Sequence, residues 1–152
     1  MKRIRMILFA LICTCLITMN GACRKTTVQN VSIPENNGSG VDVDLTDLSG
    51  NMVYAQVYDM VTSPEKYRRK TVKMRGLFAT RTDEKTGELQ YGCVIQDALA
   101  CCAQGIKFIP AEEMRYPDDF PAMGDEITVT GEFDFTMDGN VINCILKGAE
   151  TE

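Results

Sequence analysis

The stretch "EITVTGEFDFTMDGNVINCILK", residues 126–147, decides the fold class. Its first half alternates apolar and polar residues from Ile127 to Phe135, which is the two-residue period of a half-buried strand. The segment "MDGN", residues 137–140, is typical of a hairpin turn, and apolar residues continue after it. The stretch therefore predicts two antiparallel strands joined by a tight turn.

The same alternation predicts three more strands, in residues 70–81, 89–96 and 105–112. A helical spacing of apolar residues over 52–61 predicts one helix before them, with Ser49 or Asn51 as its cap. We therefore expect a mainly β domain over residues 51–149. One helix and five short strands favour a small OB-like barrel with an N-terminal helix.

The chain opens with a basic segment and an apolar run that ends at Ile17, which is the pattern of a secretory signal. Gly21-Ala22-Cys23 then resembles the bacterial lipobox, although Asn20 stands where leucine is usual. We expect a lipoprotein signal peptide over residues 1–22 and a lipid such as palmitate on Cys23. The alternative is an ordinary cleaved signal in which Cys23 has no role.

Residues 23–50 are rich in Thr, Asn, Ser, Gly and Asp and show no helical period. We expect a flexible linker there, with an edge strand at "VDVDL" as the alternative. Removal of residues 1–22 takes away three basic residues and leaves a net charge of −8. This acidic balance, outside the cytoplasm, disfavours a nucleic-acid partner, in spite of a basic cluster over residues 66–75.

Four cysteines remain in the domain: Cys93, Cys101, Cys102 and Cys144. Strand parity predicts that Cys93 and Cys144 point into the barrel. Neighbouring residues of a strand point to opposite faces, so both members of the Cys101-Cys102 pair turn inward only if a bulge or turn intervenes. Residues 103–105 are the candidate for that turn.

These thiols have three interpretations. All four together would make a zinc site, although the two C-x2-C pairs usual in such sites are absent. Disulfides are the second, either from Cys144 to one of the pair, or involving Cys93, or a strained bond between Cys101 and Cys102. In the third, the thiols are small buried hydrophobic side chains with no chemistry.

Catalysis has little support in the sequence. The chain contains no histidine, which removes the commonest general base and the usual partner of a nucleophilic cysteine. The acidic residues of 112–119 are those of a solvated loop. Thiol redox chemistry at Cys101 and Cys102 is the one enzyme-like alternative.

Three segments carry a resemblance to a known group: "VYDMVTSPEKYRRKTVKMRGLF" (57–78), "ACCAQGIKF" (100–108) and "GDEITVTGEF" (124–133). They are similar to exported OB-fold-like lipoproteins of Gram-positive anaerobes, whose function is not established and which share a Cys-Cys-x-Gln-Gly motif. The Cys-Cys pair also resembles that of the OB-like domain of permease-associated membrane proteins. Neither resemblance implies an activity.

Together these features predict a lipid-anchored module on the extracytoplasmic face of the cell membrane that binds a ligand and catalyses nothing. The leading hypothesis for the ligand is a metal, with zinc as the candidate. The alternatives are a disulfide-stapled module that docks an envelope protein or other envelope ligand, and a thiol-redox protein.

Overall fold

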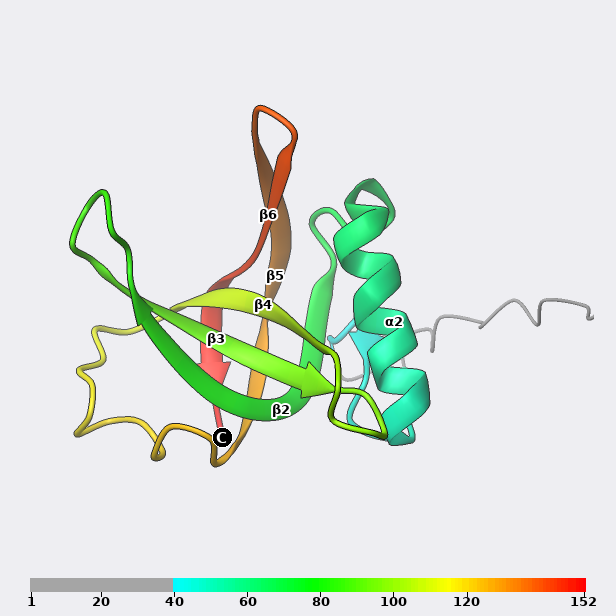
Figure 1. Cartoon of the computed structure of the whole chain (residues 1–152), viewed down its shortest axis with the longest axis horizontal. Coiled ribbons are helices and arrows are strands. Elements are labelled where there is room, and N and C mark those ends of the chain that lie inside the picture. Colours follow the sequence, from blue (N-terminus) through cyan, green and yellow to red (C-terminus); the bar gives the residue numbers. More distant parts are fainter. Residues whose placement is uncertain (1–39) are drawn as a thin grey trace, which may run out of the picture. The chain divides into compact units, whose positions relative to one another are not determined.

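A computed structural model describes residues 40–152 of the chain (Figure 1). The predicted signal peptide, Cys23 and the first part of the predicted linker lie outside the described residues. The elements are β1 (Val43–Asp44), α2 (Gly50–Thr62), a 3-10 turn (Pro64–Lys66), β2 (Thr71–Thr82), β3 (Leu89–Gln96), β4 (Ala103–Pro110), β5 (Glu126–Asp138) and β6 (Val141–Thr151). Among these residues no helix is long and apolar enough to cross a membrane.

The strands form one mixed six-stranded sheet in the order β1-β2-β3-β4-β6-β5. Strand β2 also pairs with β5, so that five of the strands close into a ring of hydrogen-bonded pairs. The β1–β2 and β4–β6 pairs are parallel, and the others are antiparallel. The predictions of a mainly β fold and of a helix before the ring strands are confirmed.

Strand β1 falls within the segment predicted to be a flexible linker, residues 23–50, and that prediction is wrong for residues 43–45. Val43 pairs with Val72 of β2, and the side chains of Val43 and Leu45 are buried. Val43 and Leu45 alternate with Asp42 and Asp44, so the two apolar side chains lie on the same face of this short segment and pack against the core. The ordered region therefore begins before Asn51.

The core fills the interior of the ring, with α2 packed against β3, β4 and β6. At another part of the core, the loop over residues 111–125 adds aromatic rings to those of the strands. The Phe120 ring lies 5.1 Å from that of Phe78 and 4.3 Å from that of Tyr91, measured between centroids. The Phe120 ring thus packs this acidic loop against the aromatic residues of the core.

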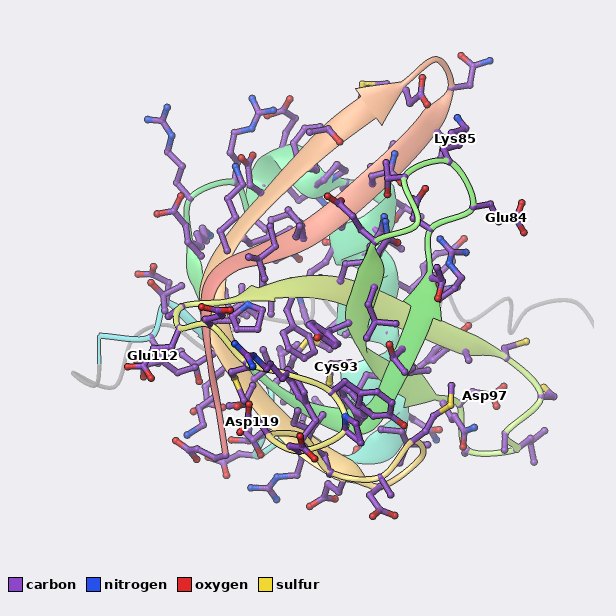
Figure 2. All side chains as sticks on the ribbon, turned by 90° about the vertical axis from the view of Figure 1, so that its left-hand side faces the viewer. Glu84, Lys85, Cys93, Asp97, Glu112 and Asp119 are labelled. Carbon is purple, nitrogen blue, oxygen red and sulfur yellow. The ribbon has the colours of Figure 1, made fainter. Side chains whose placement is uncertain are left out.

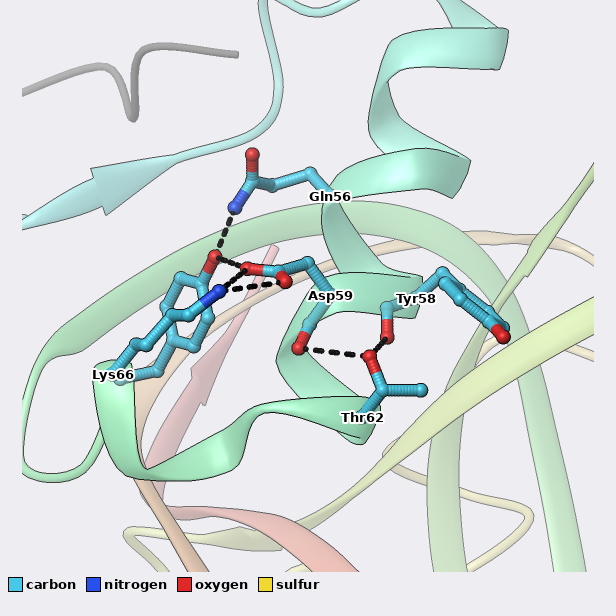
Figure 3. A network of polar contacts seen from close by, with 6 residues as sticks. Gln56, Tyr58, Asp59, Thr62 and Lys66 are labelled. Atoms are coloured by element: carbon cyan, nitrogen blue, oxygen red, sulfur yellow. Dashed lines mark hydrogen bonds and ion pairs between the residues drawn. The ribbon is translucent and has the colours of Figure 1, made fainter. Parts of the chain in front are cut away.

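Tyr67 joins α2 to the start of β2 through a polar network (Figure 3). Its buried hydroxyl donates to Oδ2 of Asp59 at 2.6 Å and accepts from Nε2 of Gln56, also at 2.6 Å. Lys66 donates to the same Asp59 carboxylate at 2.9 Å. Burial, and then the bond to Asp59, raise the pKa of Tyr67, so the hydroxyl keeps its proton and the network stays intact at neutral pH.

Removal of this hydroxyl tests the network. We expect Tyr67→Phe to lower the free energy of unfolding by about 1–3 kcal/mol, because the buried Gln56 amide loses a bonding partner. Urea denaturation measures the change. Tyr58→Phe is the matched control, because that side chain is 52% exposed, and it should change stability by less than about 0.5 kcal/mol. Equal stability of the two variants would contradict the role of the network.

Candidate metal centre

Cys101 and Cys102 lie in the turn between β3 and β4, and both are exposed. The turn is closed by hydrogen bonds from the Asp97 N–H to the Cys102 carbonyl and from the Ala100 N–H to the Asp97 carbonyl. Ala100 has a φ of 52°, in the left-handed region that non-glycine residues seldom adopt. This backbone allows both thiols to project outward from one short turn.

Residues 103–105, the candidate for a turn that would bring both thiols inward, do not form that turn. Those three residues begin strand β4, where Ala103 pairs with Gln96 and Gln104 with Ile95. The turn lies before them, at residues 97–102, so the pair is free of the alternating pattern of a strand. Both thiols therefore face solvent together.

Asp97 organises this turn. Its Oδ1 accepts hydrogen bonds from the backbone N–H of Cys101 at 2.9 Å and of Cys102 at 3.4 Å. Its Oδ2 accepts from Sγ of Cys101 at 3.1 Å, and the two Sγ atoms lie 3.8 Å apart. One ligand atom from each of the three residues lies within 4.8 Å of the others. We call Asp97, Cys101 and Cys102 the turn cluster; it is the one such group of metal-binding side chains among residues 40–152.

The charges of the turn cluster depend on these short contacts. The bonds from the Cys101 thiol and from the turn N–H groups hold the pKa of Asp97 below its usual value. The same bond to Asp97, and then the bond to Cys102, raise the pKa of Cys101 to about 11. At neutral pH the cluster is therefore a carboxylate beside a protonated Cys101 thiol. A metal ion held there would displace the thiol proton, so its affinity would increase with pH.

Cys93 and Cys144 point into the core, as strand parity predicted, and both are free thiols. Figure 2 shows Cys93 among the strands, whereas Asp97 lies at the edge of the domain. Sγ of Cys144 lies 4.0 Å from the carbonyl oxygen of Met60 on α2. The structure brings Cys101 and Cys102 together with Asp97, and it does not bring Cys93 or Cys144 to them.

Burial raises the pKa of Cys93 to about 12. Because the unfolded chain loses this proton above about pH 8.5 and the folded chain retains it, stability should fall as pH rises past that value. We expect Cys93→Ala to reduce the decline in unfolding free energy between pH 7 and pH 10. Tyr67 and Cys144, whose pKa values are also raised, remain in that variant, so the decline should shrink and not vanish. Denaturant titrations at several pH values measure it, and an identical decline in both proteins would contradict the buried thiol.

Sequence reasoning missed Asp97. The signal available was its place directly after a predicted strand and four residues before the cysteine pair, since aspartate at the start of a turn bonds to N–H groups a few residues later. What the sequence did not show was that the turn would place the carboxylate beside the sulfur atoms.

The basic cluster of residues 66–75 forms ion pairs with nearby acids. Lys66 pairs with Asp59, Lys73 with Glu152, and Arg75 with Glu126. These partners belong to α2, the C-terminus and β5, and not to the loop over residues 111–125. Each of these basic side chains is thus paired with an acidic side chain from a different part of the chain.

No family model matches the chain, and no curated protein and no solved structure was found to be similar to it. The fold and the turn cluster define a mainly β protein that carries a surface group of one carboxylate and two thiols.

Proposed function

We propose that this protein is a lipid-anchored, extracytoplasmic metal-binding module, in which Asp97, Cys101 and Cys102 hold a zinc ion. The observation that carries the proposal is the spacing of the two sulfur atoms. Two sulfur ligands at about 2.3 Å from a tetrahedral zinc lie about 3.8 Å apart. The Cys101 and Cys102 Sγ atoms are separated by 3.8 Å before any metal is added.

The carboxylate completes a set of three donors. Oδ2 of Asp97 and Sγ of Cys101 are 3.1 Å apart, somewhat closer than the about 3.6 Å expected between oxygen and sulfur ligands of one tetrahedral zinc. A metal ion would therefore open this contact by about half an ångström as it replaces the hydrogen bond. Soft thiolates favour zinc and Cu(I) over magnesium and calcium, which take oxygen ligands.

Three protein ligands leave one position of a tetrahedral ion for water or for a group of another molecule. Structural zinc sites are closed by four protein ligands, so a solvent-exposed site with three donors suits exchange of the metal. We therefore infer that the module holds its ion reversibly and passes it to, or receives it from, a partner at the envelope. Binding, and not catalysis, is the proposed activity.

The setting of the module rests on the sequence and the ring of strands. The order β2-β3-β4-β6-β5, closed by the β2–β5 pairing, supports an OB-like barrel. The signal pattern and Cys23 support export and attachment to the outer face of the cell membrane.

The alternatives have less support from the geometry. In a disulfide-stapled docking module, a bond from Cys93 or Cys144 to the Cys101-Cys102 pair would have to join buried thiols of the core to exposed thiols of the turn. A thiol-redox role needs a reactive thiolate, and the raised pKa of Cys101 keeps this thiol protonated at neutral pH.

Native mass spectrometry of the full chain in detergent, with and without added zinc, tests the proposal, together with a count of free thiols. We expect one zinc ion for each chain at pH 7.5 and loss of that ion at pH 5, where protons compete for the thiols. In the processed chain, which has lost residues 1–22 and carries the lipid on Cys23, four reactive thiols after zinc removal and denaturation would agree with the structure. No bound zinc at pH 7.5 with all thiols reduced would overturn the proposal, and a mass two hydrogens lower would favour the disulfide alternative.

A further inference from the structure

A second candidate site lies away from the turn cluster, between two hairpins. A hollow of about 750 Å³ separates the β2–β3 loop from the β5–β6 hairpin, with residues 82–86 on one side and residues 136–147 on the other. Both hairpins project from the domain in Figure 1, and Figure 2 shows Glu84 and Lys85 on the loop beside the β5–β6 hairpin. The volume is within the range of about 300–1,000 Å³ that is typical of ligand sites.

A smaller hollow of about 250 Å³ continues from it over the outer faces of β2, β3 and β4. The two hollows share Arg81 and Lys107. Ala79, Gly92 and Gly105 are the small residues of the smaller hollow's floor, and Gln90 and Val94 also line it. We call the two together the hairpin groove.

The backbone conformation does not require glycine at position 92 of this floor. Gly92 does not adopt the left-handed backbone conformation that favours glycine. A Cβ atom added there would meet its nearest neighbours, the carbonyl oxygens of Ile106 and Ala79, at 3.8 and 3.9 Å. The fold therefore tolerates a side chain at position 92, and its absence keeps the groove clear.

The charges of the groove differ between its two parts. The smaller hollow is lined by two cations, Arg81 and Lys107, and by no acidic residue. Neither cation lies within 4.0 Å of a carboxylate among residues 40–152, although backbone hydrogen bonds, and then the charges of both cations, lower the pKa of the nearby Asp83. Asp83 lines the larger hollow. Its carboxylate accepts hydrogen bonds from the backbone N–H groups of Lys85 and Thr86 and from the side-chain amide of Gln90.

The two cations extend from the two strands that flank β3. Arg81 pairs with Gln90 of β3, and Lys107 pairs with Gly92 of the same strand from the other side. Two strand spacings put their backbones about 10 Å apart across the sheet. A hollow that runs across three strands, with a cation on each of the two outer strands, suits an extended ligand with more than one anionic group.

The larger hollow has another character. It combines Glu84 and Asp138 with Lys85, the side-chain amide of Asn143 and the hydroxyls of three threonines. Such a mixture of donors and acceptors, with both signs of charge, suits a neutral ligand segment that is rich in hydroxyl groups.

From these observations we propose that the hairpin groove binds an acidic oligosaccharide. Arg81 and Lys107 hold its anionic groups over the Gly92 floor, and its hydroxyl groups bond to the polar side chains between the two hairpins. This site is separate from the metal proposal and does not depend on it.

A single-stranded nucleic acid fits the groove less well, although it is also an extended polyanion. Proteins that bind single strands stack the bases on exposed aromatic rings. The one aromatic residue along the groove is Tyr91, and its ring packs against Phe78, Phe108 and Phe120.

Calorimetric titration of the full chain in detergent tests the proposal with four probes: tetragalacturonate, a chondroitin sulfate tetrasaccharide, uncharged maltotetraose and the oligonucleotide dT6. We expect saturable binding of at least one acidic tetrasaccharide, roughly tenfold or more tighter than maltotetraose, as one charge-assisted contact would give. Arg81→Ala and Lys107→Ala should each weaken it by a similar factor, and Gly92→Leu should abolish it.

Three variants serve as controls. Arg115→Ala removes an exposed cation outside the groove, and Gly50→Leu adds a leucine where a new Cβ meets nothing within 4 Å. Both should bind as the wild type does, and so should Cys101→Ser, which separates this site from the metal site. Binding of neither acidic probe, equal binding of maltotetraose, tighter binding of dT6, or undiminished binding by folded Arg81→Ala and Lys107→Ala would each overturn the proposal.

Discussion

Replacement of both Cys101 and Cys102 by serine should weaken zinc binding by at least about 100-fold. Substitutions next to metal ligands already cost about 10–100-fold in affinity, and this variant removes two ligands at once. Both residues are exposed, so the substitutions leave the core unchanged. Competition with a chromophoric zinc chelator measures the affinity.

Asp97→Asn and Cys144→Ala complete the series. The asparagine variant retains an oxygen that can accept the turn hydrogen bonds but loses the negative charge, and we expect an affinity about 10-fold lower. Cys144 is buried away from the turn cluster, so its alanine variant should bind zinc as the wild type does. Unchanged affinity in the double serine variant, or loss of binding in Cys144→Ala alone, would contradict the site.

Gly76→Val should destabilise the fold by about 3 kcal/mol, the upper end of the usual cost of overpacking. A Cβ at position 76 would lie 2.6 Å from the carbonyl oxygen of Val94, 2.7 Å from Cδ1 of Ile95 and 2.8 Å from Sγ of Cys93. Backbone oxygen cannot rotate away as a flexible side chain can, so strands β2 and β3 would have to separate. Urea denaturation of both proteins measures the loss.

Gly92→Ala is the matched control for that substitution. Its added methyl group meets its nearest neighbour at 3.8 Å, an ordinary van der Waals contact, so the expected change is less than about 0.5 kcal/mol. Equal losses in the two variants would show that glycine matters in these strands through backbone freedom. The close approach at Gly76 would then have no special role.

Much of the fold follows from local patterns. The alternation in β3 and β5 predicts the strands and the inward direction of Cys93, because burial on one face acts directly on the residue sequence. Strand β1 was harder to predict, since its two residues depend on a parallel partner nearly thirty positions away in β2. The closing β2–β5 pairing is likewise a long-range contact with no local signature.

The candidate site was predictable only in part. The Cys101-Cys102 pair is conspicuous in the sequence, but its outward direction depends on the left-handed backbone at Ala100 and on the hydrogen bonds of Asp97. The spacing of candidate ligand residues along the chain predicts neither the backbone conformation of Ala100 nor the hydrogen bonds of Asp97. A four-cysteine site was a reasonable expectation from composition, and burial of Cys93 and Cys144 separates them from the pair.

X-ray absorption spectroscopy at the zinc edge of the zinc-loaded chain counts the sulfur atoms around the metal. We expect two sulfur ligands at about 2.3 Å, with oxygen ligands at about 2.0–2.2 Å from Asp97 and water. A shell of four sulfur atoms would contradict the proposed site, since Cys93, Cys144 or a second chain would then have to supply ligands. A shell without sulfur would remove the turn cluster from the function altogether.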